Sequence, residues 1–146
     1  MKTPLIYCSR QKTKGFTLTE MLIAVTIIAL LAMFAVPAYN EQGKKTRRSD
    51  AKVALTNAAQ ALERCNIQYD AYNSASCVNP LAGGGTITTD GGFYTITATT
   101  LSATAFTLTA TPKPGGGQDS DSACTTFTLN QAGAKGATGG AASECW

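Results

Sequence analysis

The chain has 146 residues, enough for one domain, and 12 lysines and arginines against 9 acidic residues give it a formal net charge of +3. Hydrophobic residues make up 44% of it and charged residues only 14%, which argues against a disordered polar chain. The sequence has no histidine, so it lacks the usual general base and the commonest zinc ligand. The composition therefore predicts a protein that is not an enzyme, and it assigns no catalytic residue, metal ligand or cofactor.

The first segment of the chain joins a basic stretch to an apolar one. Residues 1–15 carry four basic residues and no acidic one, and residues 16–36 form an apolar run. As a helix, that run would be about 31 Å long, against roughly 30 Å of bilayer hydrocarbon. A secretory signal peptide would place small residues for cleavage after the apolar run, but Pro37 follows it. The small residue, Gly15, lies before the run instead.

This junction resembles the class III signal of type IV prepilins. The resemblance rests on Gly15-Phe16-Thr17-Leu18-Thr19-Glu20, although many relatives have an aliphatic residue at the position of Thr19. In that family a membrane aspartic peptidase cleaves after the glycine and N-methylates the new N-terminus. The resemblance implies that residues 1–15 are a cleaved leader, that Phe16 becomes N-methylated, and that residues 16–36 remain as a transmembrane and filament-core helix.

Glu20 is a charged residue at the start of this apolar run. A carboxylate within a bilayer costs roughly 2.5–3.5 kcal/mol on insertion scales, so it needs a partner. The resemblance implies one, because in pilins this glutamate is thought to meet the N-terminal amine of a neighbouring subunit during filament assembly. The alternative is that Glu20 extends to the lipid headgroups and has no further role.

Residues 37–69 are expected to continue the helix as an amphipathic segment. Apolar residues recur there at three- and four-residue steps, so one face can pack on a sheet. Pro37 lacks a backbone donor and is expected to kink the helix. The basic residues Lys44, Lys45, Arg47 and Arg48 are expected to contact lipid headgroups and then acidic groups of neighbouring subunits, with DNA phosphates as the alternative.

The remainder of the chain has the composition of strands and turns. After a connecting loop over residues 70–92, apolar and polar residues alternate over 93–99, 104–111 and 125–130. These stretches predict an antiparallel sheet in a head that spans residues 93–146. The predicted fold class is therefore α+β, with a long N-terminal helix packed on a small antiparallel sheet.

Cleavage of the leader removes Cys8 and leaves four cysteines in an oxidising compartment. An even number of cysteines there indicates disulfides, and three connectivities are open. Proximity along the chain favours Cys65–Cys77 and Cys124–Cys145, of which the second staples a C-terminal loop.

The C-terminal part of the chain contains three distinctive segments: Phe106–Pro112, Phe127–Asn130 and the terminal Glu144-Cys145-Trp146. These segments resemble PilE-like minor pilins, a type IVa subgroup related to the ComP pilins that bind DNA during uptake. This resemblance implies a structural subunit, expected to be a minor one, of a pilus that supports twitching motility, adhesion or DNA uptake. One alternative is a DNA-binding uptake pilin, with Lys113, Lys135 and Trp146 as candidate contacts.

A second alternative is a type II secretion pseudopilin, although such proteins usually lack this cysteine pattern, and Asp119 and Asp121 are a thin basis for the calcium site common among them. The resemblance also implies the partners: other pilin subunits, the prepilin peptidase and N-methyltransferase, an inner-membrane assembly platform and motor, and membrane lipid before assembly. The expected location is the inner membrane, with a single span and a periplasmic head, followed by the extracellular filament. Loss of the leader would leave 8 basic against 9 acidic side chains.

Overall fold

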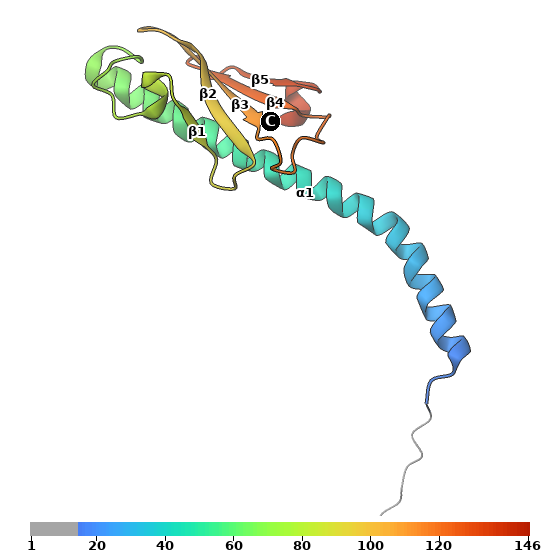
Figure 1. Ribbon diagram of the computed structural model, residues 1–146. Helices are drawn as coiled ribbons and strands as arrows, with labels where there is room; N and C mark the ends of the chain where they lie inside the picture. The colour runs from blue at the N-terminus through green and yellow to red at the C-terminus, as the bar shows by residue number, and fades with distance from the viewer. Residues whose placement is uncertain (1–14) are drawn as a thin grey trace, which may run out of the picture. The chain divides into compact units, whose positions relative to one another are not determined.

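The structure is a computed structural model that describes residues 15–146, so Cys8 and the basic residues of the expected leader lie outside the described residues. The described chain divides into two units, with the boundary between residues 39 and 40. The elements are, in chain order, α1 (Leu18–Tyr69), the 3₁₀ helix η1 (Pro80–Gly83), β1 (Thr86–Thr88), β2 (Tyr94–Leu101), β3 (Phe106–Pro112), β4 (Thr126–Asn130), β5 (Lys135–Thr138) and α2 (Ala142–Cys145). Figure 1 shows them in the colours of the chain.

Helix α1 is 52 residues long and belongs to both units. It continues through Pro37, where the kink expected from the sequence stays a prediction. It ends at Tyr69 because the next residue, Asp70, has a positive φ of 55°, the left-handed conformation that commonly terminates helices. The long helix predicted over residues 16–69 is therefore present.

The five strands form one antiparallel sheet in the order β1-β2-β3-β4-β5. Every neighbour in the sheet is also a neighbour in the sequence, and the longest connection is the loop over residues 113–125 between β3 and β4. Between β4 and β5 the chain turns at Gly133, whose φ of 73° suits a residue without a side chain. The sheet confirms the predicted α+β class.

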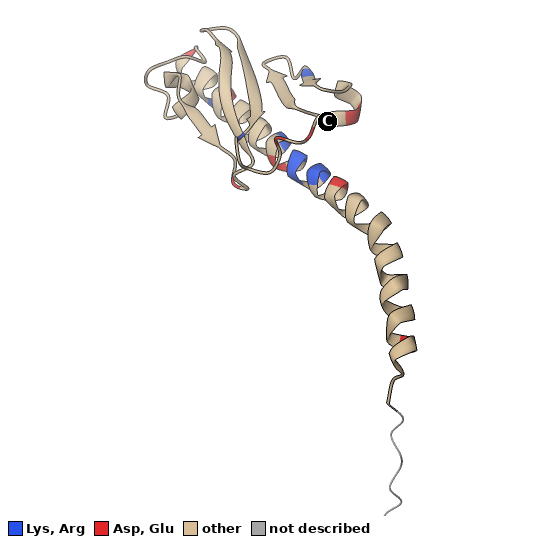
Figure 2. Cartoon of the chain, turned by 45° about the vertical axis from the view of Figure 1, so that its right-hand side comes forward, with Lys and Arg blue, Asp and Glu red and all other residues tan. Residues whose placement is uncertain are grey.

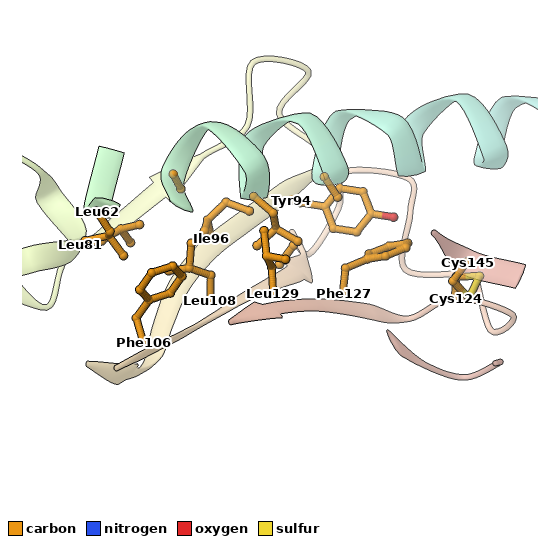
Figure 3. Close-up of a cluster of buried hydrophobic side chains, with 14 of the residues drawn as sticks. Leu62, Leu81, Tyr94, Ile96, Phe106, Leu108, Cys124, Phe127, Leu129 and Cys145 are labelled. Carbon is orange, nitrogen blue, oxygen red and sulfur yellow. A yellow bond between two sulfur atoms is a disulfide. The ribbon is translucent and has the colours of Figure 1, made fainter. Parts of the chain in front are cut away.

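The core of the second unit lies between the sheet and one face of α1 (Figure 3). Leu55 and Leu62 of α1 are fully buried against it, two turns apart on the helix. The sheet contributes alternate residues of its three central strands, as the period-2 pattern predicts. These are Tyr94 and Ile96 from β2, Phe106, Leu108 and Ala110 from β3, and Phe127 and Leu129 from β4.

Two disulfides cross-link segments of the second unit. Cys65, near the end of α1, bonds to Cys77 in the following loop. Cys124 bonds to Cys145 of α2, which closes the C-terminal loop expected from the sequence. Figure 3 shows the second disulfide beside Phe127 at one end of the buried cluster.

Two strands lie where the sequence predicts none. β1 and η1 fall within residues 70–92, which the sequence predicts only as a connecting loop, so the sheet begins before residue 93. β5 follows β4 within the disulfide loop. Both strands are short and have few buried side chains, so neither carries an alternating apolar pattern. They form because the edges of β2 and β4 offer unpaired backbone groups.

Candidate functional site

The N-terminal end of α1 holds Glu20 in a capping arrangement. Glu20 Oε2 accepts hydrogen bonds from the backbone N and from Oγ1 of Thr17, both at 2.8 Å. The Glu20 backbone N in turn donates to Thr17 Oγ1 at 3.2 Å. This is the reciprocal pattern of a capping box, which satisfies donors at the start of a helix. The Thr-x-x-Glu spacing signals this capping box in the sequence, although the cap is not among the features predicted above.

The helical turns after Glu20 expose their apolar side chains. Leu22, Ile28, Phe34 and the other large side chains between residues 16 and 36 are all more than half exposed. The helix is long and apolar enough to cross a membrane. Figure 2 shows this stretch almost without charged residues, Glu20 being the acidic one near its start. Such a surface needs lipid or protein around it.

Gly15 and Phe16, the residues of the expected cleavage junction, lie before α1 and are exposed. A Cβ built on Gly15 would meet no atom of the described residues within 4 Å. The junction therefore lies exposed in a segment that is neither helix nor strand.

Three basic residues of α1 contact the loop between β3 and β4 of the same chain. Arg48 donates from Nε to Asp121 Oδ2 and from Nη2 to Asp121 Oδ1, each at 2.6 Å. The side chains are 9% and 1% exposed respectively, so the ion pair is buried. Gln118 Nε2 donates to the same carboxylate at 2.8 Å, and the backbone N of Cys124 donates to it at 3.3 Å.

This network fixes the charge of both partners. The hydrogen bond that Arg48 donates to Asp121 raises the pKa of Arg48 above its ordinary value. Burial disfavours the charged form of Asp121, but the hydrogen bond and the charge of Arg48 outweigh it and hold the pKa of Asp121 below its ordinary value. Asp121 is thus an ionised anchor for Arg48. No cluster of three or more acidic, cysteine or histidine side chains that could hold a metal ion occurs within residues 15–146.

Two further basic residues of α1 bind the same loop. Lys44 Nζ pairs with Glu41 at 2.9 Å and donates to the Ser120 carbonyl at 3.3 Å. Arg47 Nη1 donates to the Gly117 carbonyl at 2.7 Å, and its guanidinium lies 4.9 Å from the centre of the Phe93 ring. From the sequence, this basic cluster is expected to contact lipid headgroups and acidic groups of neighbouring subunits, with DNA phosphates as the alternative. In the structure three of its four members, Lys44, Arg47 and Arg48, hold the β3–β4 loop on α1, where Figure 2 shows basic residues of the helix in blue.

Trp146 and Lys135, two of the three candidate contact residues, lie together. Lys135 Nζ is 5.0 Å from the centre of the Trp146 indole. The indole is held by a 2.7 Å hydrogen bond from Nε1 to the Gly136 carbonyl and by an edge contact with Phe127. Lys113, the third candidate, follows β3 and does not line the cavity that these two residues border.

This cavity beside Trp146 has a volume of about 360 Å³. α1 contributes Lys52 and Thr56 to its wall, and β5 contributes Lys135. Burial, with the positive charges of Arg48 and Lys135, lowers the pKa of Lys52. Lys52 is not predicted as a site residue from the sequence, because only the fold brings this helical lysine to the same cavity as Lys135. Two lysines and an indole around one cavity suit an anionic ligand with a flat group.

Comparison with known proteins assigns the family. A family model described as "Type IV minor pilin ComP, DNA uptake sequence receptor" matches residues 37–128, more than half of the chain. The chain belongs to this family of type IV minor pilins. A second model, the prokaryotic N-terminal methylation motif, matches residues 10–36 of this pilin.

Individual relatives agree with this family. The type IV major fimbrial protein FimA of Dichelobacter nodosus is 44% identical over 55 residues, and a fimbrial protein of the same organism is 40% identical over 55 residues. Each match covers 38% of this pilin and 34% of the relative, so the chain matches about a third of their length. The solved structure of the non-core minor pilin PilV of Neisseria meningitidis shares the fold, with a TM-score of 0.52 and 22% identity over 66% of this chain and 88% of that chain.

Proposed function

We propose that this protein is a structural subunit of a type IV pilus, present in the filament as a minor pilin. Its role is assembly and contact, and no catalytic step is assigned to it. The observation that carries the proposal is the exposed apolar face of α1 with a carboxylate, Glu20, at its start. This surface suits lipid before assembly and other pilin helices afterwards.

Processing follows from the junction at Gly15 and Phe16. A prepilin peptidase cleaves between these residues on the cytoplasmic side and methylates the amine of Phe16. The subunit waits in the inner membrane with its head in the periplasm, and an assembly platform with its motor moves it into the filament. Phe16 supplies the new amine, and Thr17 already holds the Glu20 carboxylate close to that end of the chain.

The pairing of Glu20 with the amine of an adjacent subunit explains why a charged residue is kept at this position. In the dry core of a filament, an ammonium and a carboxylate attract each other far more strongly than they do in water. A carboxylate left alone there would be costly. The pair therefore favours one axial step between subunits.

The processing step is tested by replacing Gly15 with valine in cells that make pili. The variant should keep residues 1–15, remain in the membrane fraction and be absent from sheared filaments. Gly43→Val makes the same substitution at the glycine within α1, so it is the matched control and should be processed normally. Cleavage of the Gly15→Val chain at the wild-type rate would contradict the assigned junction.

A second function, contact with DNA in uptake, is favoured by the cavity beside Trp146. Lys52 and Lys135 supply two charges for phosphate groups, and the indole of Trp146 supplies a stacking surface for a base or sugar. The family description, a DNA uptake sequence receptor, agrees with such a contact.

The salt dependence of binding tests this second function. The full-length pilin in detergent should bind labelled DNA. Lys135→Gln or Lys52→Gln should each reduce, by about 1, the steepness with which the logarithm of the affinity falls with the logarithm of the salt concentration. Lys113→Gln removes the same charge away from the cavity and should leave the slope nearly unchanged. Equal effects of Lys113→Gln and Lys135→Gln would show that the cavity is not the contact.

A further inference from the structure

A second cavity lies between α1 and β1, the strand at one edge of the sheet. Its volume is about 320 Å³. α1 forms one wall, the segment around Asn79 forms another, and β1 with the residues after it forms the third. Figure 1 shows β1 beside α1 at this place. All of these residues belong to the second unit.

The charge of this cavity is negative and its walls are largely apolar. Asp50 of α1 and Asp90 after β1 both line it, and its described lining residues include no lysine or arginine. Val53, Ala58 and Pro80 are among its apolar residues. A complementary ligand therefore carries a positive charge on an aliphatic stem.

Polar atoms at this cavity lack partners among the described residues. Asp50 Oδ1 accepts a 3.3 Å hydrogen bond from the Gly91 backbone N, but Asp50 Oδ2 is buried without a donor. Asn79 Oδ1 accepts from the Leu81 backbone N at 3.0 Å, which fixes the amide orientation, and its Nδ2 is buried without an acceptor. Buried polar groups normally have partners. The ligand should therefore bring both a cationic donor and a carbonyl acceptor.

The edge position of β1 favours a peptide as the source of this chemistry. β1 pairs with β2 on one side only, through Ile87 and its two neighbours. The opposite edge of an outer strand presents backbone groups that an extended peptide can pair with. A free amine would use neither this edge nor the Asn79 donor.

We propose that this cavity receives a lysine residue from an extended segment of a neighbouring pilus subunit. The lysine ammonium pairs with Asp50 and Asp90, its aliphatic stem lies against the helix wall, and its main-chain carbonyl accepts from Asn79. The identity of the neighbour rests on the proposed function, whereas the preference of the cavity for a lysine residue does not.

Peptide binding to the unassembled protein tests that preference. The full chain in detergent micelles is titrated with acetyl-valyl-lysyl-valinamide and with the matched peptide that has norleucine in place of lysine. The lysine peptide should bind saturably and about tenfold more tightly, since it alone forms a charge-assisted hydrogen bond. Equal binding of the two peptides, or no saturable binding of either, would overturn the proposal.

Substitution of aspartates inside and outside the cavity tests whether the lysine peptide binds there. Asp90 is exposed, so Asp90→Asn is not expected to disturb the fold. This variant should bind the lysine peptide with about tenfold lower affinity. Asp70→Asn is the matched control, because Asp70 is an exposed aspartate that does not line the cavity. The proposal fails if both variants bind the lysine peptide as the wild type does.

Cross-linking in filaments tests the identity of the neighbour. A carbodiimide joins carboxylates to amines that touch, so sheared pili should give a peptide of Asp90 or Asp50 joined to a lysine of another subunit, and the yield should fall in Asp90→Asn. Filaments that contain the subunit without this cross-link would refute the assignment to a neighbouring subunit. Absence of the subunit from filaments would contradict the proposed function instead, and the peptide titration then decides the inference.

Discussion

Arg48 and Asp121, 73 residues apart in the sequence, form a buried ion pair through two hydrogen bonds of 2.6 Å. Arg48 lies on α1, and Asp121 lies in the loop that leads into the C-terminal disulfide. The pair therefore couples the helix to the loop at a point where Gln118 and Cys124 also bind the carboxylate. Removal of one partner should cost much more than an exposed ion pair contributes.

The Asp121→Asn variant should lower the free energy of unfolding by about 3 kcal/mol, because it leaves the buried charge of Arg48 without a counter-charge. Chemical denaturation of the full chain in detergent measures the change. Asp119→Asn is the matched control, since Asp119 is exposed and accepts one hydrogen bond from Gly115. The interpretation is wrong if the two variants are equally stable.

The same pair predicts a loss of stability in acid. The pKa of Asp121 is held below its ordinary value in the folded chain, so the pair contributes its full stability above the unfolded pKa of about 3.9. This contribution disappears as the pH falls through the lower, folded pKa. The denaturant concentration at the midpoint of unfolding should fall more steeply with decreasing pH for the wild type than for Asp121→Asn. Parallel curves would contradict the assignment.

The sequence predicts the local parts of this fold well and the long-range parts poorly. The period-2 burial of β2, β3 and β4 and the apolar face of α1 are visible in residues such as Tyr94, Phe106 and Leu55, because each signal lies within one element. Arg48 is different. In the sequence it is one of four basic residues within a polar stretch of the helix. Its burial depends on the carboxylate of Asp121, which only the fold brings near.

Because Tyr94 is buried, we expect the folded protein to lose stability at high pH. Burial raises the pKa of Tyr94 to about 12, whereas an unfolded tyrosine titrates near 10. Between these values the unfolded chain ionises first, which favours unfolding as the pH rises. Denaturation midpoints should therefore decline from about pH 10 to about pH 12, and Tyr94→Phe should flatten that decline. Tyr39→Phe, which alters an exposed tyrosine, should leave the decline unchanged.

The disulfides Cys65–Cys77 and Cys124–Cys145 should each contribute about 3 kcal/mol, because they close loops with sequence separations of 12 and 21 residues. Replacement of each pair by serines should lower the free energy of unfolding by that amount. Peptide mapping without reduction identifies the pairs directly, and a peptide that joins Cys65 to Cys124 would contradict the connectivity.

The sequence indicates several individual residues of the candidate site but not which of them lie close together. Glu20 stands out because a carboxylate in an apolar run is rare, and Lys135 and Trp146 were identified as separate residues. Their proximity to Lys52 was not predictable, because β5 has no apolar alternation and reaches this position only by pairing with β4. The cavity at Asp50 and Asp90 was missed for the same reason, since β1 is a strand of three residues.

The measurement that tests the central claim most directly is the amount of Glu20→Gln subunit in sheared pili, relative to the amount in the membrane, by quantitative mass spectrometry. Glutamine keeps the capping box with Thr17 but removes the charge, whereas Thr17→Ala removes the capping hydroxyl and keeps the charge. The account predicts that Glu20→Gln is processed and inserted but falls by about tenfold or more in filaments, while Thr17→Ala assembles nearly normally. Normal incorporation of Glu20→Gln would contradict the account, because the carboxylate would then have only its capping role.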